Sequence, residues 1–384
     1  MKTIRLIAVI LSGVITALPA LAIDEPHREK ARAILDKSIT YLKSQQSPEG
    51  AWLTDPGPAV TALVAAGMIR DEKTDSNDPA VRKAIAYILS QQQETGGIHS
   101  GLLENYNTSI CLMALGLLRD NTDYPDIAQR IDKAHTFLRG LQWSNQPDPA
   151  GASVDKDHPW YGGAGYGNKG RPDLSNTAML IAGLRDSGLD CKDPAYQRAI
   201  VFVTRLQGTK ANTEYADQIV PDGGFIYATS ESAEKIGTLQ TYADPPTATD
   251  SAGRSRLRTY GSMTYAGFMS YLYAELDRED PRVLDAYAWV QRNYTLDENP
   301  NSGMQGYYYY LHVFARAMAA WGEPTITTHD GRSHDWANEL IDKLATLQRE
   351  DGSFINDQKD RWMEGEPVLA TAYAVLALQE ALGR

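Results

Sequence analysis

Cysteine, phenylalanine and basic residues are scarce in this sequence of 384 residues, which has 2 Cys, 6 Phe and 37 Lys and Arg. Two cysteines cannot hold a small disulfide-rich fold together, and 42% hydrophobic residues provide for a large core instead. The basic residues are outnumbered by 49 Asp and Glu, which gives a formal net charge of -12. A general nucleic-acid binder needs the opposite balance, so we expect no nucleic-acid partner.

Long hydrophobic runs are absent after the N-terminal region, so we expect no stable insertion into a membrane. At the N-terminus, Lys2 and Arg5 precede an apolar run over 6–18, and an A-x-A sequence ends at Ala22. This order is typical of a secretory signal peptide. We therefore predict a signal peptide over 1–22, cleaved after Ala22, and a secreted or periplasmic mature chain.

The two cysteines lie in different surroundings. Cys111 belongs to an apolar, helical run, whereas Cys191 lies in a polar connection between Asp190 and Lys192. An oxidising compartment would permit a disulfide between them. The surroundings favour a buried thiol and a separate thiol in the connection.

One series of segments has the pattern of amphipathic helices, each with one charged, solvent-exposed face. Several open with Asp-Pro, as at Asp78-Pro79, where Asp can cap a helix and Pro is suited to its first position. Each ends in a glutamine; the series is Gln46, Gln92, Gln142, Gln207, Gln291 and Gln348.

A second series alternates with the first and lacks acidic and basic residues throughout, which indicates buried helices. Its members are 58–69, 107–118, 175–184, 261–274, 306–315 and 367–378. The alternation predicts a single all-α domain over 23–384, an (α/α)6 toroid of six helix pairs. The helices without charged residues, which we call the dry helices, form its inner ring, and the amphipathic helices form its outer ring. An open superhelix would leave the dry helices more exposed.

Long connections run from the outer helices to the inner ones, with insertions at 143–175 and 208–260. The connections in the other direction are mostly short. All the long connections therefore emerge at one end of the toroid, and insertions gathered on one face usually mark a binding face.

The sequence resembles a known repeat family at residues 46–52 (QSPEGAW) and 348–354 (QREDGSF). Both are similar to the Q-x-x-D-G-x-W repeat of squalene cyclases and protein prenyltransferase β subunits, and weaker copies occur at 92–98 and 222–225. The resemblance implies an α/α toroid like that of secreted bacterial proteins with these repeats and no assigned activity. It also implies structural roles, tying outer helices together, for Gln46, Trp52, Gln348 and Phe354.

The catalytic motifs of that family do not carry over. The D-x-D-D acid of the cyclases and the magnesium-binding D-D-x-x-D motif are both absent. Neither cysteine has the neighbouring Asp and His that a zinc site of the prenyltransferase type needs. We therefore expect no metal ion and no cofactor.

Candidate ligand-binding residues gather in the insertion before residue 175. They combine aromatic faces, flexible glycines and charge, and they are Trp160, Tyr161, Tyr166, Asn168 and Arg171. This pattern is neither a P-loop nor a dinucleotide-binding motif. It fits a loop that stacks on a sugar or covers a ligand, or a packed loop with tyrosines at its rim.

The later connections supply further candidates. Arg258, with Arg254 and Arg256, precedes a dry helix and could bind an anion or form ion pairs. Tyr260 and Tyr265 follow as candidate ligand-binding residues.

Within the run of four tyrosines at 307–310, Tyr309 shares a helix face with His312, so that the pair could transfer protons or simply be buried. At most one or two of the four tyrosines can face a cavity. Glu366, with Glu364 nearby, is a candidate acid or base, and Trp362 a candidate ligand contact.

Three functions remain open from the sequence. The first is a secreted toroid that binds a small-molecule lipid or oligosaccharide in its central cavity without turning it over. The second is a polysaccharide lyase or hydrolase at the loop face, a comparison at the level of fold alone. The third is a divergent isoprenoid cyclase that uses Asp173, Asp244 or Glu366 as its acid.

Overall fold

The computed structural model describes residues 23–167, 170–229 and 239–383. The predicted signal peptide over 1–22 lies outside the described residues, as does the candidate Asn168. Cys111 is buried and Cys191 partly exposed, and both are free thiols, as predicted.

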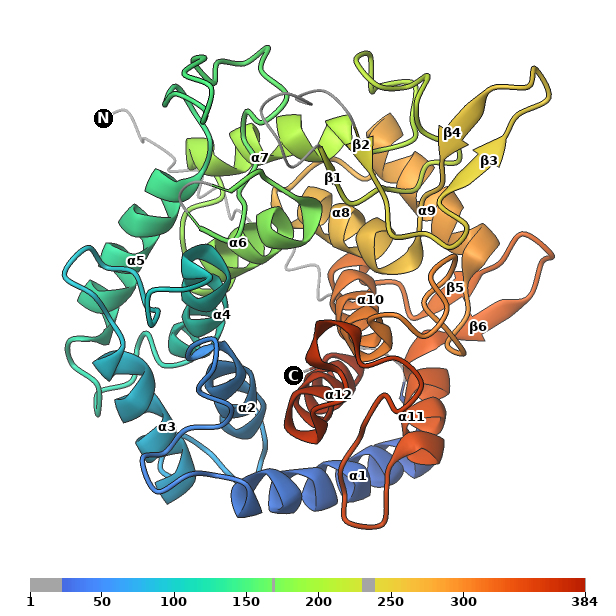
Figure 1. Cartoon of the computed structure of the whole chain (residues 1–384). Coiled ribbons are helices and arrows are strands. Elements are labelled where there is room, and N and C mark those ends of the chain that lie inside the picture. The colour runs from blue at the N-terminus through green and yellow to red at the C-terminus, as the bar shows by residue number, and fades with distance from the viewer. Residues whose placement is uncertain (1–22, 168–169, 230–238, 384) are drawn as a thin grey trace, which may run out of the picture.

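Helices of the described residues form two concentric rings (Figure 1). Each inner helix packs against the next one along the chain, and α12 packs against α2, so that the ring is closed. The predicted all-α toroid is thus confirmed. The inner ring consists of α2 (Ala59–Ile69), α4 (Glu104–Gly116), α6 (Leu174–Asp186), α8 (Gly261–Tyr273), α10 (Tyr307–Trp321) and α12 (Pro367–Ala381). The outer ring consists of α1 (Glu25–Ser44), α3 (Pro79–Ser90), α5 (Ile127–Leu141), α7 (Pro194–Arg205), α9 (Pro281–Asn293) and α11 (Trp336–Leu347).

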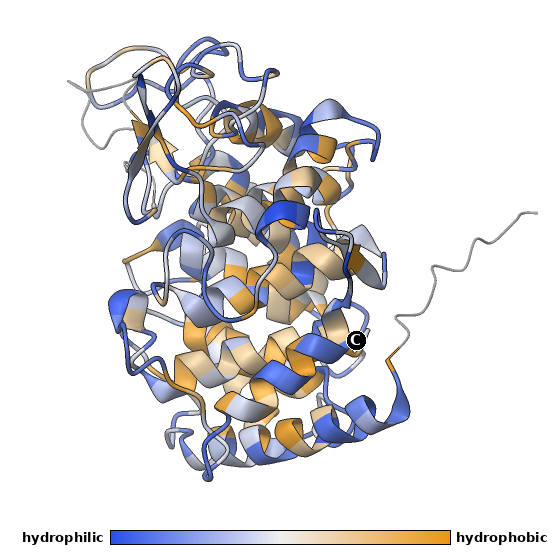
Figure 2. Ribbon diagram, turned by 90° about the vertical axis from the view of Figure 1, so that its right-hand side faces the viewer, coloured by the Kyte–Doolittle hydropathy of each residue, from blue (hydrophilic) through white to orange (hydrophobic). Residues whose placement is uncertain are grey.

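Hydrophobic periodicity explains which helices lie inside. In α3 the buried residues Val81, Ala84, Ile85 and Ile88 recur at intervals of three and four, which gives one apolar stripe. In α2, by contrast, buried residues occupy nearly every position, so this helix is covered on all sides. Figure 2 shows the same contrast between the apolar inner helices and the outer helix α1, which mixes hydrophilic and hydrophobic residues along the lower edge of the view.

Five of the six glutamines at the ends of the outer helices connect their helix to the next outer helix. Gln46 Nε2 donates to the carbonyl oxygens of Gly50, at 3.0 Å, and of Ala80 in α3, at 2.8 Å. Gly50 has φ +92°, and its Cα lies so close to Lys83 in α3 that a Cβ atom would clash. Gln92, Gln142, Gln207 and Gln348 bridge their own turn and the next outer helix in the same way.

Hydroxyl groups at the start of the inner helices hold the incoming chain. Thr61 Oγ1 accepts a hydrogen bond of 2.9 Å from the amide of Trp52, and the Trp52 indole donates to the carbonyl of Leu42. The same threonine contact recurs at Thr108, Thr177, Thr264 and Thr371. These contacts agree with the structural roles that the repeat implies for Gln46, Trp52, Gln348 and Phe354.

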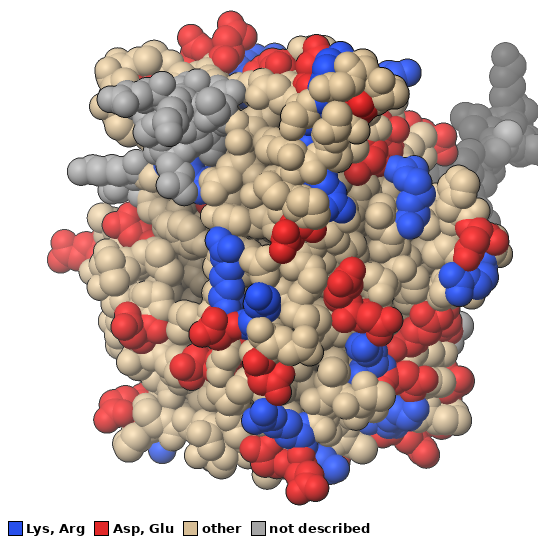
Figure 3. All heavy atoms as spheres, turned by 45° about the vertical axis from the view of Figure 1, so that its right-hand side comes forward, with Lys and Arg blue, Asp and Glu red and all other residues tan. Residues whose placement is uncertain are grey.

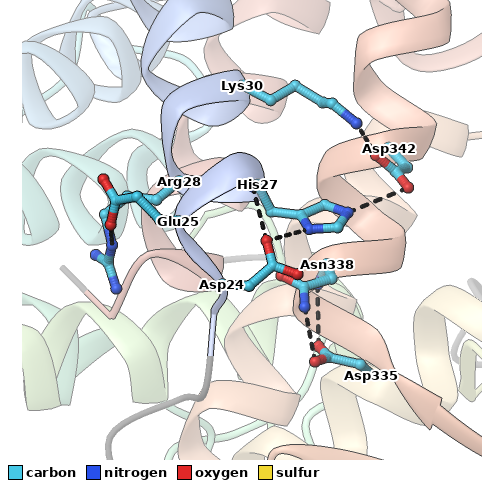
Figure 4. A network of polar contacts seen from close by, with 8 residues as sticks. All are labelled: Asp24, Glu25, His27, Arg28, Lys30, Asp335, Asn338 and Asp342. Atoms are coloured by element: carbon cyan, nitrogen blue, oxygen red, sulfur yellow. Dashed lines mark hydrogen bonds and ion pairs between the residues drawn. The ribbon is translucent and has the colours of Figure 1, made fainter.

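The outer ring closes where the first helix meets the last outer helix (Figure 4). Lys30 of α1 donates to Asp342 of α11, and His27 Nε2 lies 3.3 Å from the same carboxylate. His27 Nδ1 lies 2.6 Å from Asp24, which caps α1 by accepting from the His27 amide.

Short antiparallel hairpins lie in the connections between helices. β1 (Ala228–Thr229) pairs with β2 (Leu239–Gln240), and β3 (Thr247–Thr249) pairs with β4 (Ser255–Leu257), all within the connection from α7 to α8. β5 (Thr325–Thr327) and β6 (Ser333–Asp335) follow α10 at the other end of the barrel. A short 3-10 helix, Arg361–Met363, precedes α12. None of the described helices is long and apolar enough to cross a membrane.

Candidate functional site

A cavity of about 200 Å³ lies in the centre of the ring, at the N-terminal ends of the inner helices. This is the end where the long connections emerge. All six inner helices contribute to its wall, together with the connections before α2, α4, α6, α8 and α12. The lining residues are Pro56, Gly57, Ala59, Val60, Leu103, Tyr106, Asn107, Tyr166, Ser175, Tyr227, Tyr260, Ser262, Met263, Tyr309, Trp362, Met363, Glu364, Leu369 and Tyr373. We call this space the upper cavity.

Aromatic rings make up much of the wall of the upper cavity. Their hydroxyl groups are largely occupied within the protein: the Tyr106 and Tyr373 oxygens lie 3.1 Å apart, and Tyr309 pairs with Ser175 at 2.9 Å. Ring faces and edges are therefore left to meet a ligand. The aromatic lining residues are Tyr106, Tyr166, Tyr227, Tyr260, Tyr309, Trp362 and Tyr373.

Glu364 is the single charged side chain among the described lining residues of the upper cavity. It is 1% exposed, and its two oxygens each accept a bond of 2.8 Å, from the Tyr309 amide and from Asn356 Nδ2. Burial raises the pKa of Glu364 to about 7, against these hydrogen bonds, which favour the charged form. The group thus titrates near neutral pH and caps the start of α10 from another segment.

The tyrosines of the wall are weaker acids than a tyrosine in water. Burial raises the pKa of Tyr166 to about 12 and raises the pKa values of Tyr106, Tyr227 and Tyr309 as well. Their hydroxyl groups stay protonated at neutral pH, so they serve as hydrogen-bond donors and not as bases.

The amides at the N-terminal ends of the inner helices would attract an anion if they were free. Several are already occupied by side chains. Asn107 Oδ1 accepts from the Ala59 amide at the start of α2, at 3.0 Å, and Asp173 accepts from the Asn176 amide of α6, at 2.8 Å. Glu364 does the same for α10. These ends are thus capped internally.

Asp173 lies behind the wall and does not line the upper cavity. It is 2% exposed and also accepts from Asn176 Nδ2 at 2.8 Å. Burial raises its pKa to about 6, while the bonds from Asn176 oppose this shift. Its contacts are those of a helix cap.

Four residues predicted from the sequence meet in the upper cavity: Tyr166, Tyr260, Tyr309 and Trp362. Tyr166 and Trp362 lie at its mouth, with 41% and 39% of their surface exposed. Of the four consecutive tyrosines, only Tyr309 lines the cavity, within the predicted limit of one or two. Arg171 lies close by, with its guanidinium 5.2 Å from the Tyr227 ring centre.

The other candidates lie elsewhere. Trp160 and Tyr161 pack with Trp143 in a small separate cluster under their own loop, because that loop buries its own apolar side chains. Tyr265 points into the core, where its ring centre lies 5.1 Å from that of Phe314.

Three of the four candidate catalytic residues also lie away from the upper cavity. Arg258 donates to the carbonyls of Asp244 and Pro245 within its own connection, both at 3.1 Å, and to Asn301 Oδ1 in the connection before α10. Glu366 is exposed at the start of α12. His312 lies one turn beyond Tyr309, and its buried ring stacks on that of Tyr373, with centres 5.4 Å apart.

Three important lining residues escaped the sequence analysis, Tyr106, Tyr227 and Tyr373, and Glu364 was considered there only together with Glu366. A signal for two of them exists, since Tyr106 and Tyr373 lie two positions from the recurrent Thr108 and Thr371. No pattern distinguishes Glu364 from the exposed Glu366.

Charge and metal ligands give no second indication of a site. Figure 3 shows acidic and basic side chains interspersed over the visible face, in keeping with many surface ion pairs. Within the described residues, no group of three or more His, Cys, Asp and Glu side chains is placed to hold a metal ion.

No protein-family model matches the sequence. Solved structures of similar fold include the type II terpene cyclase MstE from Scytonema, with TM-score 0.53 and 14% identity over 94% of this chain and 99% of that one. The α-1,6-mannanase of glycoside hydrolase family 76 from Salegentibacter has TM-score 0.56 and 10% identity over 92% and 99% of the two chains. A variant of that mannanase was solved with α-1,6-mannotriose.

A possible member of glycoside hydrolase family 105 from Klebsiella pneumoniae has TM-score 0.53 and 10% identity, over 99% of both chains. At such low identities these similarities establish the α/α toroid fold and leave the activity undetermined.

Proposed function

We propose that the protein binds an uncharged, largely apolar small molecule in the upper cavity. The observation that carries this proposal is the composition of the wall. Aromatic rings and aliphatic side chains such as Val60, Met263 and Leu369 dominate it, and no Lys, Arg or His occurs among the described lining residues. Burial of apolar ligand surface contributes about 25 cal/mol per Å², so such a wall favours apolar ligands.

The same wall argues against an anionic ligand. A uronate or a diphosphate buried here would find no cation among the described lining residues, and it would face the carboxyl group of Glu364. The helix ends at the cavity are capped by side chains and offer little compensation. The raised pKa of Tyr309 also makes this phenol a poor base for a lyase at neutral pH.

A neutral oligosaccharide is the second candidate ligand. The half-exposed rings of Tyr166 and Trp362 at the mouth are suited to stacking on sugars. Hydrolysis by the usual mechanism requires two carboxyl groups, however, and Glu364 is the single one among the described lining residues. We therefore rank hydrolysis below binding of an apolar molecule.

Direct binding measurements on the mature chain would test the proposal. Calorimetry and Trp fluorescence would compare an uncharged polyene and a sterol with neutral α-1,6-linked mannose oligomers. We expect the apolar probes to bind and the variant Val60→Trp, which fills the cavity, to weaken binding at least tenfold. Leu284→Ala is the matched control, because Leu284 is exposed on α9, away from the cavity.

The outcomes separate the alternatives. Binding of the mannose oligomers alone would overturn the proposal in favour of the carbohydrate function. Apolar binding that Val60→Trp leaves unchanged would place the ligand outside the upper cavity and would contradict the proposal equally.

A further inference from the structure

A second cavity of about 170 Å³, which we call the lower cavity, lies at the C-terminal ends of the inner helices. Among the described residues, none lines both cavities. Tyr373 lines the upper cavity and His312 the lower one, and their rings stack with centres 5.4 Å apart. This pair therefore forms part of the wall between the two cavities.

Two ion pairs from four inner helices line the lower cavity. Arg316 of α10 donates to Asp186 of α6 at 2.5 Å, and Arg70, which ends α2, donates to Glu380 of α12 at 2.8 Å. In the sequence, each of these residues follows the end of an uncharged segment by one or two positions. These four charged side chains therefore meet at the C-terminal ends of the inner helices.

His312 adds a buried polar side chain to the wall of the lower cavity. The residue is 2% exposed, and its Nδ1 atom has no hydrogen-bond partner among the described residues. Burial, together with Arg316 and Arg70, lowers the pKa of His312 well below its usual value, so the imidazole is neutral. A buried nitrogen left in this state is costly, and each such case in a native protein calls for an explanation.

The chemistry of the lower cavity matches hydroxyl groups. A guanidinium beside a carboxylate places donors next to acceptors, and a hydroxyl group both donates and accepts. Within each ion pair the arginine and the carboxylate already neutralise each other. The charge of a ligand with net charge would therefore remain uncompensated in this largely buried space. The aliphatic side chains of Leu63, Ile110 and Leu376 complete the wall and suit the C–H face of a ring.

From these contacts we propose that the lower cavity binds an uncharged polyhydroxylated ring of monosaccharide size. Hydroxyl groups bridge the Arg316–Asp186 and Arg70–Glu380 pairs, and one of them bonds to the His312 imidazole. Access is from the far end of the barrel, where Leu117 is 42% exposed and the Asp186 side chain 25%. The site is independent of the function proposed for the upper cavity.

Calorimetric titration of the full chain would test this site, with glucose, mannose, galactose and myo-inositol as probes. We expect at least one of them to bind. Leu117→Trp blocks the opening and should weaken binding at least tenfold. His312→Leu should do the same while leaving the thermal stability equal or higher, because it removes a buried nitrogen that has no partner among the described residues.

Trp362→Ala, which changes only the upper cavity, is the matched control and should leave binding of these probes unchanged. Loss of binding in this variant would assign the sugar to the upper cavity and overturn the proposal. Binding of glycine betaine or an amino acid in place of the neutral rings would overturn it in favour of a zwitterion. Absence of binding by all four probes would overturn it as well.

Discussion

Glu364 takes up its proton under conditions in which an ordinary glutamate has lost it. Its pKa of about 7 exceeds the usual value of 4.5 because the carboxyl group is buried. Between these two values the folded protein holds a proton that the unfolded chain releases. The resulting stabilisation is fully present below about pH 4.5 and is lost as the pH rises through 7.

Replacing Glu364 by Gln should remove this pH dependence while keeping the shape of the side chain. Relative to the variant, the wild type should lose on the order of 3 kcal/mol of unfolding free energy between pH 4.5 and 8. Urea unfolding at several pH values measures the difference. Glu366→Gln, two residues away and exposed, should show no such effect, and parallel curves for Glu364→Gln and the wild type would contradict our account.

The contrast between Glu364 and Glu366 also marks a limit of sequence analysis. Trp362 and Met363 have φ angles of 59° and 65°, which non-glycine residues rarely adopt. This left-handed turn directs Glu364 inward, beneath the start of α10, and leaves Glu366 in solvent. Because the turn contains no Gly or Asn at these positions, the sequence predicted both carboxylates at the loop face without showing which one is buried.

Each repeated element of the outer ring depends on one amide side chain. Gln207 is fully buried: Nε2 donates to the carbonyls of Gly223 and Arg282, and Oε1 accepts from the Tyr271 hydroxyl at 2.8 Å. Gln291, the fifth glutamine of the series, donates to the carbonyl of Thr327 at a more exposed site. The glutamine therefore makes more hydrogen bonds, and is more deeply buried, in some repeats than in others.

Gln207→Leu should destabilise the protein by about 2–4 kcal/mol, because it leaves several buried polar groups without partners. Gln291→Leu removes one exposed bond and should cost less than about 1 kcal/mol. Thermal unfolding of both variants measures the difference. Equal costs would show that burial of the amide does not determine the strength of this tie.

The elements themselves were largely predictable, because their burial follows from hydrophobic periodicity. The uncharged segments became the inner helices, and Asp78 caps α3 by accepting from the Ala80 amide at 2.9 Å, as the Asp-Pro pattern indicated. The long loops were less predictable. Trp160 was expected at a ligand, yet it packs against Trp143 with ring centres 5.1 Å apart, a choice that depends on contacts distant in sequence.

The whole molecule is a closed ring, and its closure depends on contacts between the two ends of the chain. Among the inner helices, α12 packs against α2, and among the outer helices α1 packs against α11. In the outer seam, Asp342 accepts from both Lys30 and His27 (Figure 4). A closed ring lacks the free ends of an open superhelix, so the seam contributes to the cooperativity of the entire domain.

His27 makes this seam sensitive to pH. Partial burial lowers the pKa of His27, but its bonds to Asp24 and Asp342 outweigh this effect, and the net shift is upward. The stabilisation is therefore fully present below about pH 6.5 and is lost as the pH rises through the raised pKa.

His27→Gln should cost about 0.5–1 kcal/mol at pH 5.5 and less at pH 9, measured by urea unfolding. The matched control is Arg28→Gln, because Arg28 pairs with Glu25 within α1, at 3.7 Å, and does not cross the seam. If both variants changed stability equally at both pH values, the effect would arise within the helix. A pH-dependent loss confined to His27→Gln would instead assign the effect to the charged imidazole between Asp24 and Asp342, where the two ends of the ring meet.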